Sequence, residues 1–174
     1  METPATTTKI DRGSTDSTAI YQEGTDLVYE RTFDAPRDLV WRALTERDLI
    51  ERWWGRAGSS TTVEEWDLRP GGRWRYVTRD RDGNDYTFYG EILEVEPPSK
   101  IKWTFMFDVE GLGPQGGPET MTLEEMDGRT QMRAVSHFPS SEAIDAALAT
   151  GMSEGAVETW DRLEALLAEE QAQA

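Results

Sequence analysis

The feature that most constrains the fold is a long stretch with period-two hydropathy between residues 60 and 138, followed by one helical segment. Apolar and polar side chains alternate in short runs, as they do in half-buried β-strands. Turn signals such as Asp82-Gly83-Asn84 and Asp127-Gly128 separate these runs. The pattern predicts about six antiparallel strands, at Thr61–Asp67, Arg73–Thr78, Tyr86–Glu96, Ile101–Asp108, Met121–Met126 and Thr130–Phe138.

Helices are expected on both sides of this stretch. Leu27–Asp34 alternates as a further strand, and two short helices follow it at Pro36–Thr45 and Asp48–Trp54. A final helix should begin at Ser140 or Ser141 and run to about Glu170, with an apolar stripe along one face. About seven strands packed against a separate long helix make an α+β domain.

Two segments are expected to lack regular structure. Residues 1–24 are rich in Thr and Ser and poor in large apolar side chains, which predicts a disordered tail before a domain at 25–170. Gly111–Pro118 holds four glycines and two prolines, which predicts a mobile loop at the mouth of any pocket.

Composition excludes several classes of function. The net charge is −16 and the pI is about 4.4, so phosphate backbones and anionic lipid surfaces are repelled. No apolar run reaches the ~20 residues of a membrane helix, and no signal-peptide core is present. The chain has no Cys, which removes thiolate chemistry and favours a reducing, cytoplasmic location.

Catalytic and metal signatures are weak. His137 is the single histidine, and we interpret it as a strand-end residue bonded to solvent or backbone rather than as a triad member. One His without Cys argues against zinc, whereas carboxylate-only magnesium or calcium sites stay open. Asp80–Asp85 lacks the Glu that closes an EF-hand loop, so it is expected to be a hairpin turn. We therefore predict no catalytic residue, metal or cofactor.

Several short motifs resemble those of the SRPBCC superfamily, also called START-like or birch-pollen-allergen-like. Within it, the chain is similar to the bacterial branch related to activators of the heat-shock chaperone ATPase. The motifs are Phe33-Asp34-Ala35-Pro36-Arg37 with Val40-Trp41, Arg52-Trp53-Trp54-Gly55, Asp67-Leu68-Arg69-Pro70-Gly71-Gly72, and Gly151-Met152-Ser153-Glu154-Gly155. They span roughly Leu27 to Ala168 in unbroken order. One departure is Ala156, where many relatives carry an aromatic residue.

The resemblance implies a helix-grip fold, in which a curved sheet wraps a C-terminal helix and leaves a cavity between them. Members bind lipids, polyketides, plant hormones or antibiotics; some assist polyketide cyclisation, and eukaryotic relatives stimulate a chaperone. Such a cavity would be lined by flat rings with a few polar tips. The expected ligand-binding residues are Trp54, Trp74, Tyr76, Phe88, Trp103, Phe105, Met132, Met152, Gly155 and Thr159.

Two pairs of neighbours in this set leave alternatives open. Trp53 and Trp54 are adjacent on a short helix, so one is expected in the core and the other near the cavity rim. Gly151 and Gly155 are both expected inside the final helix, where glycine costs about 0.5–1 kcal/mol relative to alanine. We expect open cavity volume at Gly155 and close approach of the sheet at Gly151.

The leading functional hypothesis is non-catalytic binding of a small hydrophobic molecule, aromatic or polyketide-like. The first alternative is an enzyme of the polyketide cyclase or aromatase type, which an inward-facing Arg or a pKa-shifted carboxylate would favour. The second is a protein-interaction role toward a chaperone, which an exposed apolar patch would favour. Neither nucleic acid nor membrane is expected as a partner.

Overall fold

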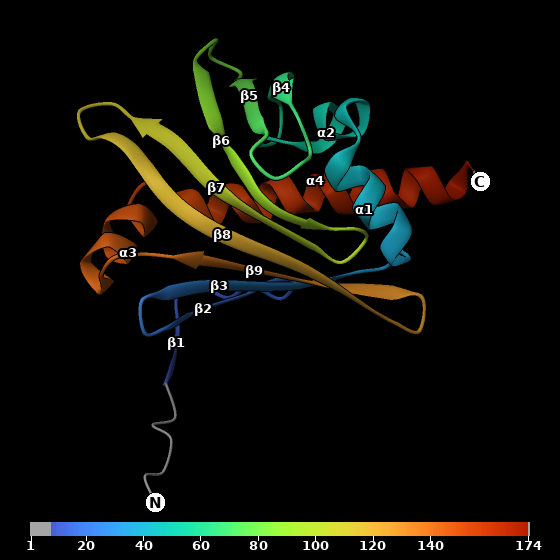
Figure 1. The fold of residues 1–174 in the computed structure, drawn as a ribbon, viewed down its shortest axis with the longest axis horizontal. Helices are drawn as coiled ribbons and strands as arrows, with labels where there is room; N and C mark the ends of the chain where they lie inside the picture. Colours follow the sequence, from blue (N-terminus) through green and yellow to red (C-terminus); the bar gives the residue numbers. More distant parts are fainter. Residues whose placement is uncertain (1–7, 174) are drawn as a thin grey trace, which may run out of the picture.

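A computed structural model describes residues 8–173 and contains a nine-stranded, fully antiparallel curved sheet with four helices (Figure 1). The strand order is β1-β2-β3-β9-β8-β7-β6-β5-β4, so β1 and β4 form the two free edges. The elements are β1 (Lys9–Asp11), β2 (Ala19–Glu23), β3 (Asp26–Phe33), α1 (Arg37–Thr45), α2 (Arg47–Trp53), β4 (Ser60–Trp66), β5 (Arg73–Arg79), β6 (Asp85–Glu96), β7 (Lys100–Val109), β8 (Gly113–Met126), β9 (Arg129–His137), α3 (Ser141–Leu148) and α4 (Met152–Ala172).

The sheet lies across α4, with α1 and α2 at one end of the helix (Figure 1). Most strands pair with their neighbours in sequence, but β3 pairs with β9, in the register Val28 to Val135. This long-range pairing joins the N-terminal strands to the strands of the last hairpin. The α+β class and the long C-terminal helix predicted from the sequence are confirmed, with nine strands rather than seven.

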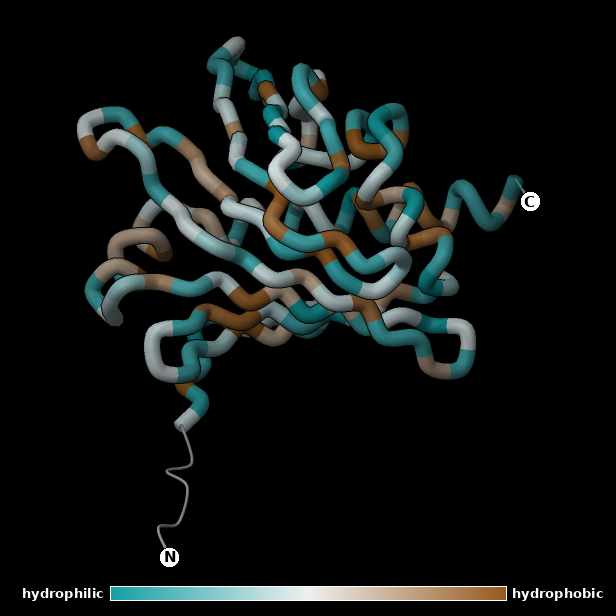
Figure 2. Tube along the Cα trace, in the orientation of Figure 1, coloured by the Kyte–Doolittle hydropathy of each residue, from teal (hydrophilic) through white to brown (hydrophobic). Residues whose placement is uncertain are grey.

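Two apolar clusters hold the layers together. In the first, Trp160 and Leu163 of α4 pack on the inner face of β3 and β9, and the rings of Tyr29 and Trp160 meet edge-on at 5.3 Å. In the second, Trp74 stacks on Trp103 at 4.7 Å within the half of the sheet formed by β4 to β7. Figure 2 shows the resulting alternation of hydrophobic and hydrophilic residues along the strands. Both clusters follow from the period-two pattern.

The expected N-terminal tail is wrong from Lys9 onward, because β1 and β2 extend the sheet beyond β3. Ile20 is buried against the main core, and the neighbouring Thr18 and Gln22 are buried as well. Gln22 is satisfied by donating to the Gly24 carbonyl at 2.9 Å. In β2 the three consecutive residues Ile20, Tyr21 and Gln22 are buried although Gln22 is polar, so polar composition alone misled the prediction. Residues 1–7 lie outside the described part of the chain.

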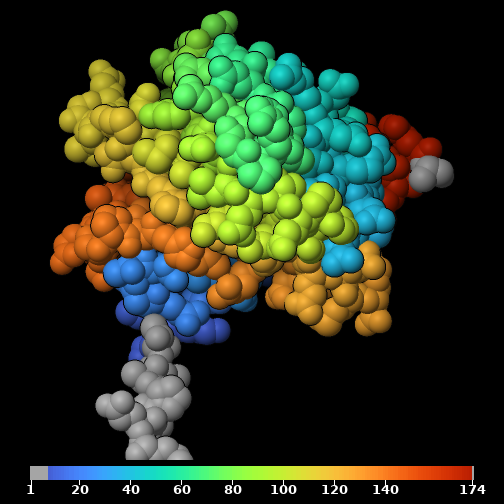
Figure 3. Space-filling model, in the orientation of Figure 1, coloured from blue at the N-terminus to red at the C-terminus, as the bar shows by residue number. Residues whose placement is uncertain are grey.

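The Gly111–Pro118 segment is mostly strand rather than loop. β8 begins at Gly113, and its residues 113–122 pair with the whole of β7, with Gly117 opposite Phe105. Only a tight turn remains, closed by the Leu112 N–H donating to the Val109 carbonyl at 3.0 Å. The tip of this hairpin projects beyond the body of the molecule (Figures 1 and 3). Backbone pairing requires no side chains, so glycine content did not prevent a strand here.

The predicted single C-terminal helix is broken into α3 and α4. Gly151 lies at the break with φ +83°, a left-handed conformation that favours glycine, and it caps the start of α4. Its conformation therefore explains the glycine, and the expectation of close sheet approach inside a helix is wrong for this position.

The start of α3 was predicted correctly at Ser140 or Ser141. The Ser140 Oγ accepts a hydrogen bond from the Ala143 N–H at 3.1 Å, as an N-cap residue does.

A buried arginine connects the sheet to α4. Arg31 on β3 has a side chain that is 1% exposed, and its Nη2 lies 2.7 Å from Asp161 and 2.9 Å from Glu164. Its Nη1 donates to Thr18 Oγ1 at 3.3 Å. The two carboxylates are about half exposed, so water can solvate them if Arg31 is removed. The Arg31 guanidinium is buried, so water cannot replace the carboxylates if they are removed.

This asymmetry gives a stability prediction. Replacing Asp161 and Glu164 together by Ala should lower the free energy of unfolding by about 3 kcal/mol, because it leaves a buried charge without a counter-charge. Arg31→Met should cost less, because it leaves only half-exposed carboxylates. Urea denaturation of the two variants beside the parent measures the difference. A greater loss in Arg31→Met would show that packing, not charge, dominates at this position.

A cavity between the sheet and the C-terminal helix

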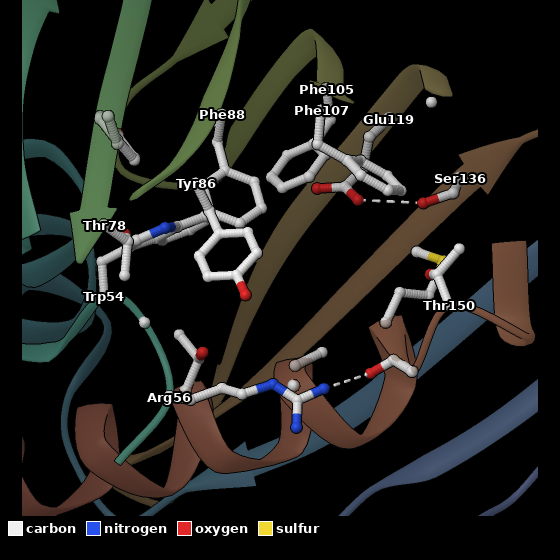
Figure 4. Close-up of a pocket in the computed structure, with 18 of the residues that line it drawn as sticks. Trp54, Arg56, Thr78, Tyr86, Phe88, Phe105, Phe107, Glu119, Ser136 and Thr150 are labelled. Carbon is white, nitrogen blue, oxygen red and sulfur yellow. Dashed lines mark hydrogen bonds between the residues drawn. The ribbon is translucent and has the colours of Figure 1, made fainter. Parts of the chain in front are cut away.

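A cavity of about 580 Å³ lies between the inner face of the sheet and α4. Its walls come from the end of α2 and the segment after it, from strands β5 to β9, and from the α3–α4 break and first turns of α4. Tyr29 of β3 and Leu44 of α1 complete them. Figure 4 shows the aromatic side chains of the sheet facing the helix across this space. The size lies in the range of small-molecule sites, about 300–1,000 Å³.

Aromatic rings form one continuous wall. Trp54 meets Tyr76 edge-on at 5.0 Å and Phe88 at 5.7 Å, and Phe88 lies 5.9 Å from Phe105. Phe107 continues the wall, 6.4 Å from Phe105. These rings come from neighbouring strands in register, such as Tyr76 opposite Phe88. The wall therefore offers flat apolar surfaces with few hydrogen-bonding groups.

Eight of the ten residues predicted from sequence lie on the cavity wall: Trp54, Tyr76, Phe88, Trp103, Phe105, Met152, Gly155 and Thr159. The other two predictions require correction. Trp74 is buried beneath Trp103 and donates from Nε1 to the Thr104 carbonyl at 3.0 Å, so its ring is used in packing. Met132 is fully buried in the core between β9 and the helices and does not reach the cavity.

The two adjacent tryptophans have different roles. Trp53 is buried and donates from Nε1 to the Ala43 carbonyl at 2.8 Å, which ties α2 to α1. Trp54 is partly exposed and lies against the aromatic wall. Arg162 of α4 fixes this segment, because its Nη1 donates to the carbonyls of Trp54, Gly55 and Arg56 at 3.1, 2.9 and 3.1 Å. The rim of the cavity is thereby attached to the helix.

Glu119 is the polar feature that stands out within the cavity. It lies on β8 directly opposite Trp103 of β7 and Ser136 of β9, so the three side chains share one row across the inner face. Trp103 Nε1 donates to Glu119 Oε1 at 3.0 Å, and Ser136 Oγ donates to Oε2 at 2.9 Å (Figure 4). Removal from water raises the pKa of the Glu119 carboxyl above its ordinary value, against the lowering effect of these two hydrogen bonds.

Sequence reasoning missed Glu119 because the strand was predicted to begin two residues later, at Met121. The inward alternation Glu119, Met121, Leu123 could have revealed it, since Met121 and Leu123 are both buried. A carboxylate on the buried apolar face of a strand is uncommon, and it indicates that the group has hydrogen-bonding partners or a functional role there.

Other polar groups lie around the cavity. His137 at the end of β9 bonds through Nδ1 to Asp26 Oδ1 at 2.7 Å, so its partner is a carboxylate rather than the expected solvent or backbone. Arg56 reaches over the first turn of α4 and donates from Nη2 to the Gly151 carbonyl at 2.7 Å (Figure 4).

Within residues 8–173, no group of three or more His, Asp or Glu is arranged to hold a metal ion. None of the helices in this range is long and apolar enough to span a membrane.

The sequence profile described as "Activator of Hsp90 ATPase homolog 1-like protein" matches residues 34–168. The chain belongs to this family. The matched region contains every residue of the cavity wall except Tyr29, so the cavity lies within the family domain. The fold is accordingly of the SRPBCC kind, as the sequence motifs indicated.

Solved structures agree with this membership. The chain is similar to protein Ms6760 from Mycobacterium smegmatis, with 30% identity, a TM-score of 0.79, and coverage of 88% of this chain and 98% of that one. A protein from Arthrobacter aurescens has 26% identity and a TM-score of 0.78, with coverage of 87% and 91%. A protein from Rhodobacter sphaeroides has 26% identity and a TM-score of 0.77, with coverage of 88% and 99%. No curated protein matches the chain significantly.

The raised pKa of Glu119 predicts how this family member responds to pH. A carboxyl whose pKa is raised on folding stabilises the fold below the pKa of the unfolded state and loses that contribution as pH rises through the folded pKa. Glu119→Gln, which keeps a hydrogen-bonding group of similar shape, should therefore raise the melting temperature near neutral pH. The gain should shrink toward zero near pH 4, where the parent carboxyl is protonated. Melting curves at both pH values test this, and a gain independent of pH would contradict it.

Proposed function

We propose that this protein binds a small hydrophobic molecule in the cavity between the sheet and α4. The observation that carries the proposal is an open volume of about 580 Å³ bordered by aromatic rings between two well-packed apolar clusters. Protein interiors normally have few voids larger than a water molecule. A space of this size, lined largely by rings and containing the Glu119 carboxyl group fixed by two hydrogen bonds, has the composition of a ligand site.

The shape of the wall supports a flat ligand. Trp54, Phe88 and Phe105 present ring faces and edges at centroid separations of 5.7–5.9 Å, which are typical of aromatic contacts. A planar aromatic or polyketide-like molecule would extend this packing. The Trp103 Nε1 is not available to a ligand, because it donates to Glu119.

Native mass spectrometry of the protein as purified tests the proposal. We expect a fraction of the protein to carry a small molecule that is released on denaturation. Isothermal titration calorimetry with 1-(methoxymethyl)naphthalene covers the case in which the natural ligand is lost during purification. Failure to retain any molecule, together with failure to bind this probe and its amine and carboxylate analogues, would overturn the proposal.

One observation favours the enzymatic alternative as a second candidate. Glu119 faces the cavity, and burial raises its pKa, so it can exchange a proton nearer neutral pH than an ordinary carboxyl can. A cyclase of the polyketide type would use such a group while the wall shapes a flexible substrate. Incubation of the parent and Glu119→Gln with a poly-β-ketone thioester distinguishes the candidates. A product that forms only with the parent would favour the enzyme.

A further inference from the structure

The Glu119 carboxylate lies in an unusual electrostatic position. The row of side chains that contains it runs from Ile92 through Trp103 and Ser136 to Leu27, and three of these four are apolar and buried. Within residues 8–173, Glu119 forms no salt bridge with a Lys or Arg, and both of its hydrogen-bond partners are neutral side chains. The nearby His137 acts to lower the pKa of the Glu119 carboxyl. His137 is itself bonded to Asp26. The carboxylate therefore has hydrogen-bond donors but no cationic partner of its own.

The carboxylate also retains unused acceptor capacity. An ionised carboxylate offers about four lone-pair sites on its two oxygens, and the protein fills one on each, from Trp103 and Ser136. These two donors hold the group in a fixed orientation on the cavity wall, and Figure 4 shows the bond from Ser136. The remaining sites are available to a donor from a bound molecule.

The other charges around the cavity favour a cation as well. Among the groups on its wall, Asp80, Asp108 and Glu110 are acidic and Arg56 is basic, while the whole chain carries −16. Clefts lined by one sign of charge concentrate ligands of the opposite sign. The rings of Phe105 and Phe107 adjoin Glu119 (Figure 4), and aromatic faces attract cations.

From these observations we propose that the cavity selects hydrophobic amines. The ammonium group would donate to Glu119 while the apolar body of the ligand lies against the aromatic wall. This inference rests on the proposed ligand-binding function and specifies its ligand class. The neutral and anionic hydrophobic molecules that the wall alone would accept should bind more weakly.

Three naphthalene probes that share one ring system test the selectivity by calorimetry: 1-naphthylmethylamine, 1-(methoxymethyl)naphthalene and 1-naphthoate. At pH 8 we expect the amine to bind at least about tenfold more tightly than the ether, as a charge-assisted hydrogen bond implies. The naphthoate should bind more weakly than the ether. Equal affinities for amine and ether would overturn the inference and leave the proposed function intact. If none of the three binds, the proposed function fails together with the inference.

Glu119→Gln should remove most of the preference for the amine and change the affinity for the ether by less than about twofold. The matched control is Glu124→Gln, on the exposed outer face of the same strand, which removes the same charge from the chain. It should preserve the preference. A preference that survives in Glu119→Gln, or disappears in Glu124→Gln, would assign it to the overall charge and overturn the inference.

A pH titration of the parent requires no variant. Protonation of Glu119 should reduce the preference for the amine as pH falls, while ether binding stays constant. The ionisable and charged groups that line the cavity with this carboxyl are His137, Tyr29, Tyr76, Tyr86, Asp80, Asp108 and Glu110, with Arg56 as the fixed cation. A preference that is unchanged between pH 8 and pH 4 would count against Glu119 as the amine partner.

Discussion

Removal of residues 1–24 should lower the free energy of unfolding by about 4 kcal/mol or more, a large share of the 5–15 kcal/mol of a typical domain. The truncation deletes β1 and β2, and with them the buried side chains of Ile20 and Tyr21. Full burial of each such side chain contributes about 1.5–3 kcal/mol. It also removes Thr18 from Arg31 and exposes the edge of β3 to solvent.

Urea denaturation of the truncated and full-length proteins measures this loss. Ile20→Ala is the matched point variant, and it should account for about 2–4 kcal/mol of the effect by leaving a cavity in the core. A truncated protein that unfolds at the same urea concentration as the parent would show that β1 and β2 contribute no stability, and that the fold is complete from β3 onward.

Most of the fold could be predicted because its strands follow the period-two rule and its turns carry the expected residues. The errors share a physical cause, since composition describes side chains whereas sheet pairing is made by the backbone. The segment at Gly113–Pro118 pairs with β7 despite its glycines, and β2 joins the edge of β3 although Thr18 and Gln22 are polar. The break at Gly151 depends on a backbone angle that hydropathy does not encode.

The cavity wall was predictable in outline, because alternation places Phe88, Trp103 and Phe105 on one face. The sequence could not predict which side chains on that face border the cavity and which are buried beneath other rings. Trp74 has the same alternation, yet Trp103 covers it, and the register between β5, β6 and β7 decides which ring lies above the other. Glu119 depends on register in the same way, because only the pairing of three strands places its two hydrogen-bond donors beside it.

Gly155→Leu should strongly weaken hydrophobic ligand binding while leaving the protein folded. Gly155 lies in the first turns of α4 and on the cavity wall. The nearest atoms that a side chain there would meet belong to the guanidinium of Arg56, at 3.1–3.4 Å, and none belongs to the sheet. Arg56 is exposed, so a leucine can displace it at the cost of its hydrogen bond to the Gly151 carbonyl. The leucine then extends into the open volume and occupies the position of a ligand.

The expected loss of affinity for 1-(methoxymethyl)naphthalene is at least about tenfold, because the ligand must give up its contacts with this part of the wall. Gly155→Ala should bind nearly as the parent does. Improved helix propensity contributes about 0.5–1 kcal/mol of stability, reduced by the shift that Arg56, 3.1 Å from the new Cβ, must make. Ala165→Leu adds similar bulk at an exposed position of the same helix and should leave binding unchanged. Calorimetry and melting curves on the three variants separate the effects. A Gly155→Leu protein that unfolds, or that still binds the probe as tightly as the parent, would exclude this part of α4 from the ligand site.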